Sequence, residues 1–332
     1  MKRFAFALAA LAVGTLAFAE DAPAAKIGGY LNAGLYIYNS DGTTTFKSYA
    51  DDYDAEGYQG VLSATLDATT YGYSLAVELA QSGAAVDTAY AWVSPFTGFK
   101  LYAGTGSDAL EELDDNDAKL FKNADGLSGV FSASGFTLGA NISAPVAAAE
   151  VAQYSFGAGY SAESLFDAVF TAQTSATEKK LDAYSISASL SAIPSLSLMG
   201  GYNVTANATD AAPFFDVTAS YTINDAWSAG VLVYDYLKNN VDGAYGNTSD
   251  LGDSIYYVPS VTYAAAKDLS FTGSFYGDTA DEPNYAGRLA ASYTGITGTT
   301  LSAYVEYNTN AAHMADDAKP LTVVNLQFLT SF

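Results

Sequence analysis

The chain ends on an alternating pattern that runs to its final residue, from Leu321 to Phe332. At the two-residue period of a β-strand, one face of this segment is apolar and the other polar. The apolar residues are Leu326, Phe328 and Phe332, and the polar ones are Asn325, Gln327 and Ser331. In water, an amphipathic strand with an open edge would promote aggregation. The pattern therefore predicts a strand that closes a barrel whose outer face meets lipid.

The first 19 residues have the three parts of a secretory signal peptide. Lys2 and Arg3 are basic, Phe4–Phe18 is apolar, and Ala17-Phe18-Ala19 fits a small-x-small cleavage site. We expect a signal peptide at 1–19 and a single barrel domain at 20–332. The apolar run has 15 residues, whereas a membrane-spanning helix needs roughly 20, so a retained anchor is the alternative.

Apolar residues are abundant although no later stretch is long enough for a membrane-spanning helix. Hydrophobic residues make up 50% of the chain and aromatic residues 14%, so an exported chain of this kind must distribute them among strands. Cysteine is absent, which excludes disulfides and thiolate chemistry.

The chain is strongly acidic, with a formal net charge of −23. Removing the signal peptide takes away Lys2 and Arg3 and leaves −25. Such a charge disfavours nucleic acid and anionic membrane surfaces as partners. It favours cations instead.

Short turns alternate with long polar loops along the mature chain. Gly, Pro, Asn, Asp and Ser dominate the short turns, as tight turn geometry requires. These turns are expected at Thr70–Gly72, Phe96–Gly98, Ser134–Gly135, Ala162–Ser164, Ile193–Ser195, Ile223–Asp225, Ala266–Asp268 and Gly295–Thr300. The long loops are Asn39–Glu56, Thr105–Ala124, Thr174–Leu181, Ala206–Ala212, Lys238–Ser254, Gly277–Asn284 and Thr309–Pro320. This asymmetry is typical of a transmembrane barrel with short periplasmic turns and long external loops.

The expected fold is all-β, a transmembrane antiparallel β-barrel of 16–18 strands. Counting alternating segments gives 18 strands, and the loss of one weak hairpin would reduce the number to 16. In Tyr184–Ser191, for example, four apolar residues oppose four serines. A soluble sandwich would usually carry Lys and Glu on its polar faces, yet charged residues make up only 15% of the chain. A confined, wet lumen explains the pattern better than the alternative, a secreted soluble sandwich or solenoid.

Both ends of the mature chain resemble bacterial outer-membrane barrels. The strand ending in Phe332 is similar to their C-terminal signature strand, in which the barrel assembly machinery reads a terminal Phe as an assembly signal. The Gly28–Gly34 segment resembles the strand that opens many general bacterial porins. This resemblance to general porins covers the whole mature chain in layout. It implies an outer-membrane location, a homotrimer, and outer-membrane lipids and small solutes as partners.

The loop after the fifth strand is the main functional candidate that the resemblance implies. In general porins this loop folds into the barrel and narrows it with acidic side chains. Here the strand Phe99–Gly104 is followed by a loop that runs through Lys122. The resemblance implies the constriction acids Asp108, Glu111, Glu112, Asp114, Asp115 and Asp117. The alternative is an acidic loop that faces outward into solvent.

The sequence departs from the porin pattern on the barrel wall. Porins typically set several arginines opposite the acidic loop, but the mature chain has one arginine, Arg288. Alternation places Arg288 and Lys100 inward, and a base on the lipid face would cost roughly 2–4 kcal/mol at mid-membrane. The same rule predicts five inward acids, namely Asp67, Glu78, Asp167, Asp216 and Glu306. We therefore expect a lumen of net negative charge.

The sequence contains no constellation that predicts catalysis or a cofactor. Its one histidine, His313, lies in the last loop, whereas enzymatic outer-membrane barrels need a His paired with Ser or Asp on facing strands. Asp114, Asp115 and Asp117 resemble the start of a calcium loop but lack the Gly and closing Glu of an EF-hand. Loose binding of divalent cations is the alternative there. We expect neither an enzyme nor a metal site.

By the porin resemblance, the expected function is passive diffusion of small hydrophilic solutes with a preference for cations. Two other functions stay open. A structural or adhesive surface protein would display its loops on a barrel with a closed lumen. A substrate-specific channel would line the lumen with aromatic rings, for which the candidates are Tyr30, Tyr36, Tyr38, Tyr102 and Tyr276.

Overall fold

A computed structural model describes most of the chain from residue 25 onward. The described stretches are 25–40, 42–48, 60–80, 83–107, 124–143, 151–162, 165–175, 180–205, 212–236, 255–279, 285–309 and 321–332. The signal peptide expected at 1–19 lies outside them. Within these stretches, no helix is long and apolar enough to cross a membrane.

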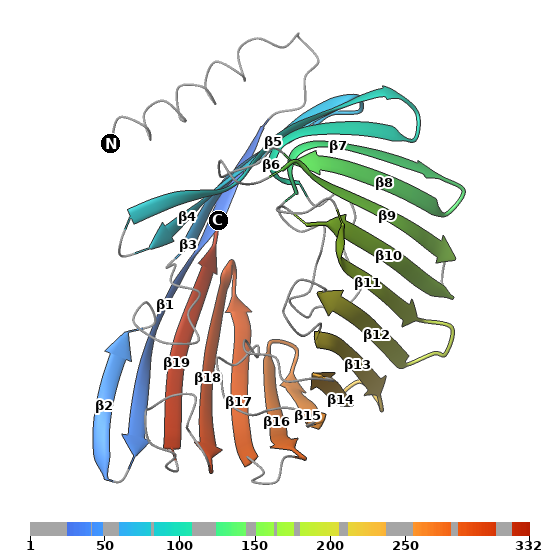
Figure 1. The fold of residues 1–332 in the computed structure, drawn as a ribbon. Coiled ribbons are helices and arrows are strands. Elements are labelled where there is room, and N and C mark those ends of the chain that lie inside the picture. Colours follow the sequence, from blue (N-terminus) through green and yellow to red (C-terminus); the bar gives the residue numbers. More distant parts are fainter. Residues whose placement is uncertain are drawn as a thin grey trace.

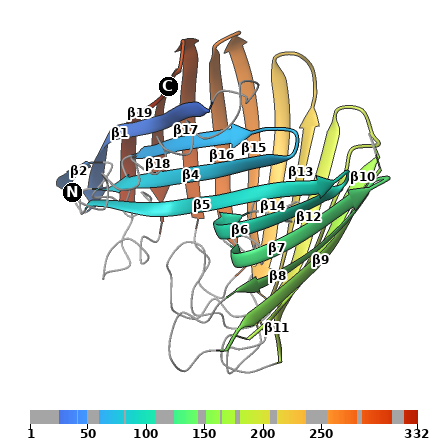
Figure 2. The ribbon, with the colours of Figure 1, turned by 90° about the horizontal axis from the view of Figure 1, so that it is seen from above.

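All regular structure in the described stretches is β-strand, and the strands form one antiparallel sheet that curls round on itself (Figures 1 and 2). The 19 strands are β1 (Lys26–Ser40), β2 (Thr43–Ser48), β3 (Gly60–Asp67), β4 (Tyr71–Ala80), β5 (Gly83–Phe96), β6 (Phe99–Ser107), β7 (Ala124–Ala133), β8 (Phe136–Ser143), β9 (Gln153–Ala162), β10 (Phe166–Thr174), β11 (Leu181–Leu190), β12 (Leu196–Thr205), β13 (Ala212–Thr222), β14 (Trp227–Tyr236), β15 (Ile255–Ala266), β16 (Leu269–Asp278), β17 (Tyr285–Ile296), β18 (Thr299–Asn308) and β19 (Leu321–Ser331).

The first and last strands close the barrel. β1 pairs with β19 from Tyr30 opposite Ser331 to Asn39 opposite Thr322. At the end of the chain, the Gly29 N–H donates to the Phe332 carbonyl at 3.1 Å, and the Phe332 N–H donates to the Gly29 carbonyl at 3.0 Å. Closure satisfies the backbone groups that an open edge would expose, as a bilayer requires. The predicted closing role of the final strand is confirmed.

The barrel has 18 strand positions although 19 strands are present. β1 is long, and two strands share its second edge: β3 pairs with Lys26–Leu31, and β2 pairs with Leu35–Ser40. Both run antiparallel to β1, so together they fill one position around the barrel. The predicted number of 18 is confirmed.

One predicted loop is partly wrong. The segment expected to be a loop from Asn39 to Glu56 contains β2, because the chain turns back through Gly42 and pairs with β1. Gly42 has φ 77°, a left-handed conformation that glycine adopts without a Cβ penalty. The Asp-Gly dipeptide and the β-branched residues that follow are hairpin signals in the sequence.

The eight short turns all lie at the end of the barrel where β1 begins and β19 ends. By the bounds of the flanking strands, four of them fall wholly within the predicted residues, for example Thr97–Gly98 between β5 and β6. The connections after β9, β11 and β13 overlap the predicted turns but extend one or two residues outside them. The turn expected at Thr70–Gly72 comes earlier, because Tyr71 and Gly72 already belong to β4. Gly72 is needed inside that strand because the Trp92 indole packs directly over it, where a Cβ would stand.

The outer face is apolar and ringed by aromatic side chains. Near the short turns, the stacked rings of Phe96 and Phe99 lie 5.1 Å apart, and the tilted rings of Trp227 and Tyr263 lie 4.6 Å apart. Toward the long loops, the rings of Phe275 and Tyr285 lie 5.8 Å apart. An apolar band between two aromatic girdles is what a bilayer selects on a barrel.

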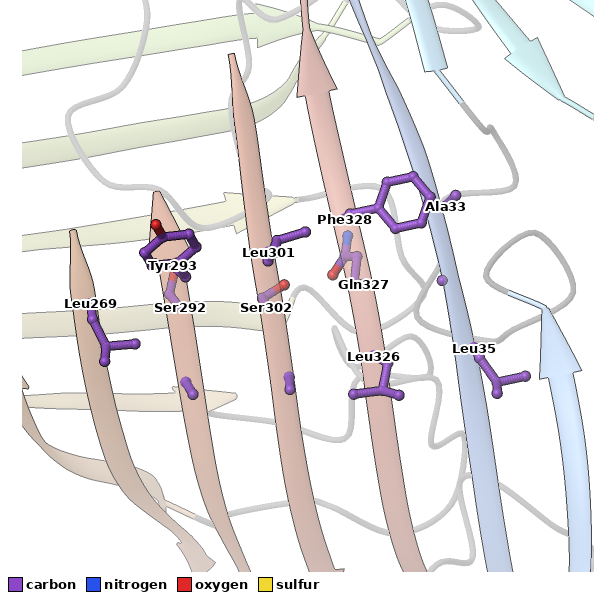
Figure 3. A pocket seen from close by; sticks show the side chains of 13 residues that line it. Ala33, Leu35, Leu269, Ser292, Tyr293, Leu301, Ser302, Leu326, Gln327 and Phe328 are labelled. Atoms are coloured by element: carbon purple, nitrogen blue, oxygen red, sulfur yellow. The ribbon is translucent and has the colours of Figure 1, made fainter. Parts of the chain in front are cut away.

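A shallow groove of about 620 Å³ crosses this outer face over β16–β19 and β1 (Figure 3). In this groove Leu326 of β19 lies beside Leu35 of β1, and Phe328 lies beside Ala33. The small side chains of Ala291 on β17 and Ala303 on β18 face each other in register and line the groove. Its outward residues are apolar, so in a bilayer we expect lipid acyl chains to fill it.

Candidate functional site

The lumen-facing side chains form the candidate functional site. On β11, Ser185 and Ser187 are buried while Ile186 between them is 52% exposed, which separates the inward face from the lipid face. A polar patch continues across β10–β13 and consists of Thr171, Ser185, Ser187, Asn203 and Asp216. Each of these side chains is 5% exposed or less. Sequence patterning predicts their polarity but not that this part of the wall is shielded from water.

Arg288 of β17 is the centre of a second lumen group, the Arg288 cluster, formed by Arg288, Glu306, Tyr276, Tyr304 and Asn325. Arg288 faces Glu306 of β18 in register, and its Nε and Nη2 both donate to Glu306 Oε2 at 2.6 Å. The guanidinium carbon lies 4.3 Å from the ring centroid of Tyr304 and 5.4 Å from that of Tyr276. The arginine charge is therefore neutralised by one partner and flanked by two rings.

The inner side of the barrel seam carries a small apolar core, the seam core, formed by Tyr36 and Tyr38 of β1 with Leu321 and Val323 of β19. Tyr304 packs against it from β18. Tyr36 and Tyr38 stack with ring centroids 6.0 Å apart, and Val323 is 2% exposed. Apolar side chains on a lumen face are unusual for a water-filled channel, so these residues stabilise the junction of the two terminal strands.

On β5 and β6, Lys100 lies in an aromatic corner. Its Nζ is 4.1 Å from the ring centroid of Trp92, which is only 7% exposed. Trp92 faces Tyr102 in register, and Tyr102 meets Tyr90 edge-on at 5.9 Å. The second inward base is therefore also held by lumen partners, through a cation–π contact rather than an ion pair.

Comparisons with known proteins agree with this architecture. No protein-family model matches the chain, and no curated protein matches it. Among solved structures, OccK11 (OpdR) of Pseudomonas aeruginosa superposes with a TM-score of 0.60 at 12% identity, covering 93% of this chain and 96% of that one. A mutant of the Rhodopseudomonas blastica porin superposes with a TM-score of 0.58 at 16% identity, covering 93% of this chain and 100% of that one. This chain has the porin-like β-barrel fold. The predicted resemblance is confirmed at the level of the fold.

The other predicted lumen acids of this porin-type barrel lie on several walls. Asp67 faces Gly72, and Gly72 faces Trp92, which places Asp67 at the turn end of the Lys100 corner. Asp167 accepts a hydrogen bond from Ser189 Oγ at 3.2 Å. Glu78 faces Val61. The structure thus distributes the predicted acids around the barrel rather than in one group.

Asp278 is a lumen acid that the sequence reasoning missed. It ends β16 and faces Tyr256, which stacks on Tyr234 at 4.8 Å, and Tyr234 faces Asp216. Both acids are 5% exposed or less. Asp216, the two tyrosines and Asp278 therefore form a row that crosses four strands, with an acid at each end. Asp278 falls at the start of a polar loop in the sequence, where alternation no longer assigns a face.

The predicted constriction acids lie outside the described residues. They are Asp108, Glu111, Glu112, Asp114, Asp115 and Asp117, and they belong to the connection between β6 and β7. His313 also lies outside them. In the described strands, no group of three or more His, Cys, Asp or Glu residues could hold a metal ion.

Phe332 lies at the end of the closing strand with 61% of its side chain exposed on the outer face. Leu326 and Phe328 share that face, at 51% and 48% exposed. The terminal aromatic is therefore available to a protein or lipid outside the barrel.

Proposed function

We propose that this chain is an outer-membrane porin that lets small hydrophilic solutes diffuse passively and prefers cations. The observation that carries the proposal is a closed 18-position barrel with an apolar outer band and a polar inner face. The two bases that the sequence predicts on the inward face are already engaged, Arg288 by Glu306 and Lys100 by Trp92. The charge that remains in the lumen then comes from the inward carboxylates and is negative. A negative lumen attracts cations and repels anions. Export by the signal peptide, insertion by the barrel assembly machinery and a homotrimeric state belong to the same proposal.

The proposed constriction is the acidic loop between β6 and β7, folded into the barrel. Its support is the polar patch on β10–β13, whose lumen-facing side chains are almost fully buried. A bare lumen wall would be wet, so burial of this degree is expected where a loop packs against the wall from within. The six acids from Asp108 to Asp117 would then lie in a narrow space where salt screens them incompletely, since the Debye length at 0.1 M salt is about 10 Å.

The test replaces Asp114, Asp115 and Asp117 together with Asn and measures reversal potentials across a KCl gradient in planar bilayers. We expect the cation-to-anion permeability ratio to fall by about fivefold, the effect of about 1 kcal/mol of Coulomb energy. The change should shrink as salt rises. A matched control changes Asp242, Asp250 and Asp253 to Asn, which removes the same charge from another long loop. Anion preference in the unmodified protein, or equal effects of the two triple variants, would contradict the proposal.

The buried polar patch also fits a second function, a structural or adhesive surface protein whose lumen is closed. The same bilayer experiment separates the two. Stable open steps support the porin, whereas a correctly inserted but electrically silent barrel supports the surface protein.

A further inference from the structure

Arg288 keeps hydrogen-bonding capacity that its ion pair does not use. A guanidinium has five N–H donors, and two of them go to the same Glu306 oxygen. The remaining three have no acceptor among the described residues. The Arg288 side chain is 31% exposed, while Glu306 is 10% exposed. The ion pair therefore holds a pre-oriented donor group at the surface of the lumen.

Aromatic rings stand on both sides of this donor group. Tyr304 and Tyr276 flank the guanidinium from β18 and β16. Behind Tyr304, the buried ring of Tyr36 on β1 lies 6.5 Å from the Tyr304 ring in an edge-on arrangement. The Tyr304 ring is anchored because it packs against the seam core. A ligand at Arg288 would therefore also meet apolar ring surface.

An unpartnered amide lies between two of these rings. Asn325 of β19 faces Tyr304 on one side and Tyr36 on the other, on the inward face. It is 1% exposed, and neither its Oδ1 nor its Nδ2 has a hydrogen-bond partner among the described residues. Leaving a buried amide unsatisfied is unfavourable, so a ligand that bonds to it offsets that cost.

The charge of the cluster decides the class of ligand. Arg288 and Glu306 cancel, so the cluster has no net charge to attract an ion. The chain as a whole, at −23, repels anions from the lumen. The cluster offers free N–H donors, a carboxylate, an amide and aromatic faces. This set suits a neutral ring that has hydroxyls at its edge and C–H groups on its face. We propose that the Arg288 cluster is a binding site for neutral cyclic sugars on the lumen wall.

This inference rests on the proposed porin function, since a sugar reaches the cluster through the lumen. The probe is maltotriose, added to single channels in planar bilayers. We expect a concentration-dependent reduction of current in the unmodified protein. Tyr276→Leu should weaken the apparent binding constant about tenfold, or about 1.4 kcal/mol, because it removes one of the two rings that flank the guanidinium. Tyr90→Leu removes a lumen tyrosine that packs against Tyr102, away from the Arg288 cluster, and should leave sugar binding within twofold.

The outcomes separate this inference from the function on which it rests. An absence of open steps would overturn both. Open steps with no response to maltotriose, or equal weakening by both tyrosine variants, would overturn the sugar site alone. Stronger block by benzoate than by maltotriose would also overturn it, because Arg288 would then act as an anion site. Calorimetric titration of the detergent-folded barrel with maltotriose checks binding without relying on current.

Discussion

At the scale of single residues, the Arg288–Glu306 pair determines the charge of the lumen wall at β17 and β18. Glu306→Gln would leave the buried side of the guanidinium without its counter-charge, because both hydrogen bonds go to one Glu306 oxygen. The wall would gain one net positive charge, so the cation-to-anion permeability ratio should fall by about twofold to fivefold. Reversal potentials in a KCl gradient measure this. Glu306→Asp keeps the charge and is the control. A Gln variant with the ratio of the unmodified protein would mean that solutes do not pass near this pair.

At the scale of elements, the seam between β1 and β19 depends on side chains as well as on backbone pairing. Val323 is 2% exposed in the seam core, so Val323→Ala should destabilise the barrel by about 1–2 kcal/mol. The next residue, Val324, points to the lipid face of the same strand, and Val324→Ala is the matched control because lipid replaces its contacts. The measurement is the temperature at which the folded barrel loses its faster migration on a gel. Equal shifts for the two variants would contradict a stabilising role of the seam core.

At the scale of the whole molecule, the last residue of the chain takes part in closing the barrel. Phe332 makes two backbone hydrogen bonds to Gly29 and presents its ring outside the barrel. We expect deletion of Phe332 to leave export intact but to lower the yield of heat-modifiable, membrane-inserted barrel several-fold. Phe46→Ala is the comparison, because Phe46 is 64% exposed but lies on β2, away from the closing strand. Normal insertion of the deletion variant would show that Phe332 is not part of an assembly signal.

Prediction from sequence succeeded where the physical cause is local. Turn residues such as Ser134 and Gly135, with φ of 51° and 82°, mark hairpins because few residues adopt these conformations easily. Alternation also predicts an inward position for Arg288 and Lys100, since a strand has only two faces. It misjudged Thr43–Ser48, where pairing with the long first strand turned an expected loop into β2.

The sequence by itself determined that the chain is a closed, lipid-facing barrel, because period-two alternation and turn chemistry act between neighbouring residues. Only the tertiary structure decided which strands meet and what their lumen faces build together. Arg288 and Glu306 are 18 residues apart in the chain, and Tyr36 and Tyr304 come from opposite ends of it. These groups become neighbours through strand register across several strands, which no local pattern encodes.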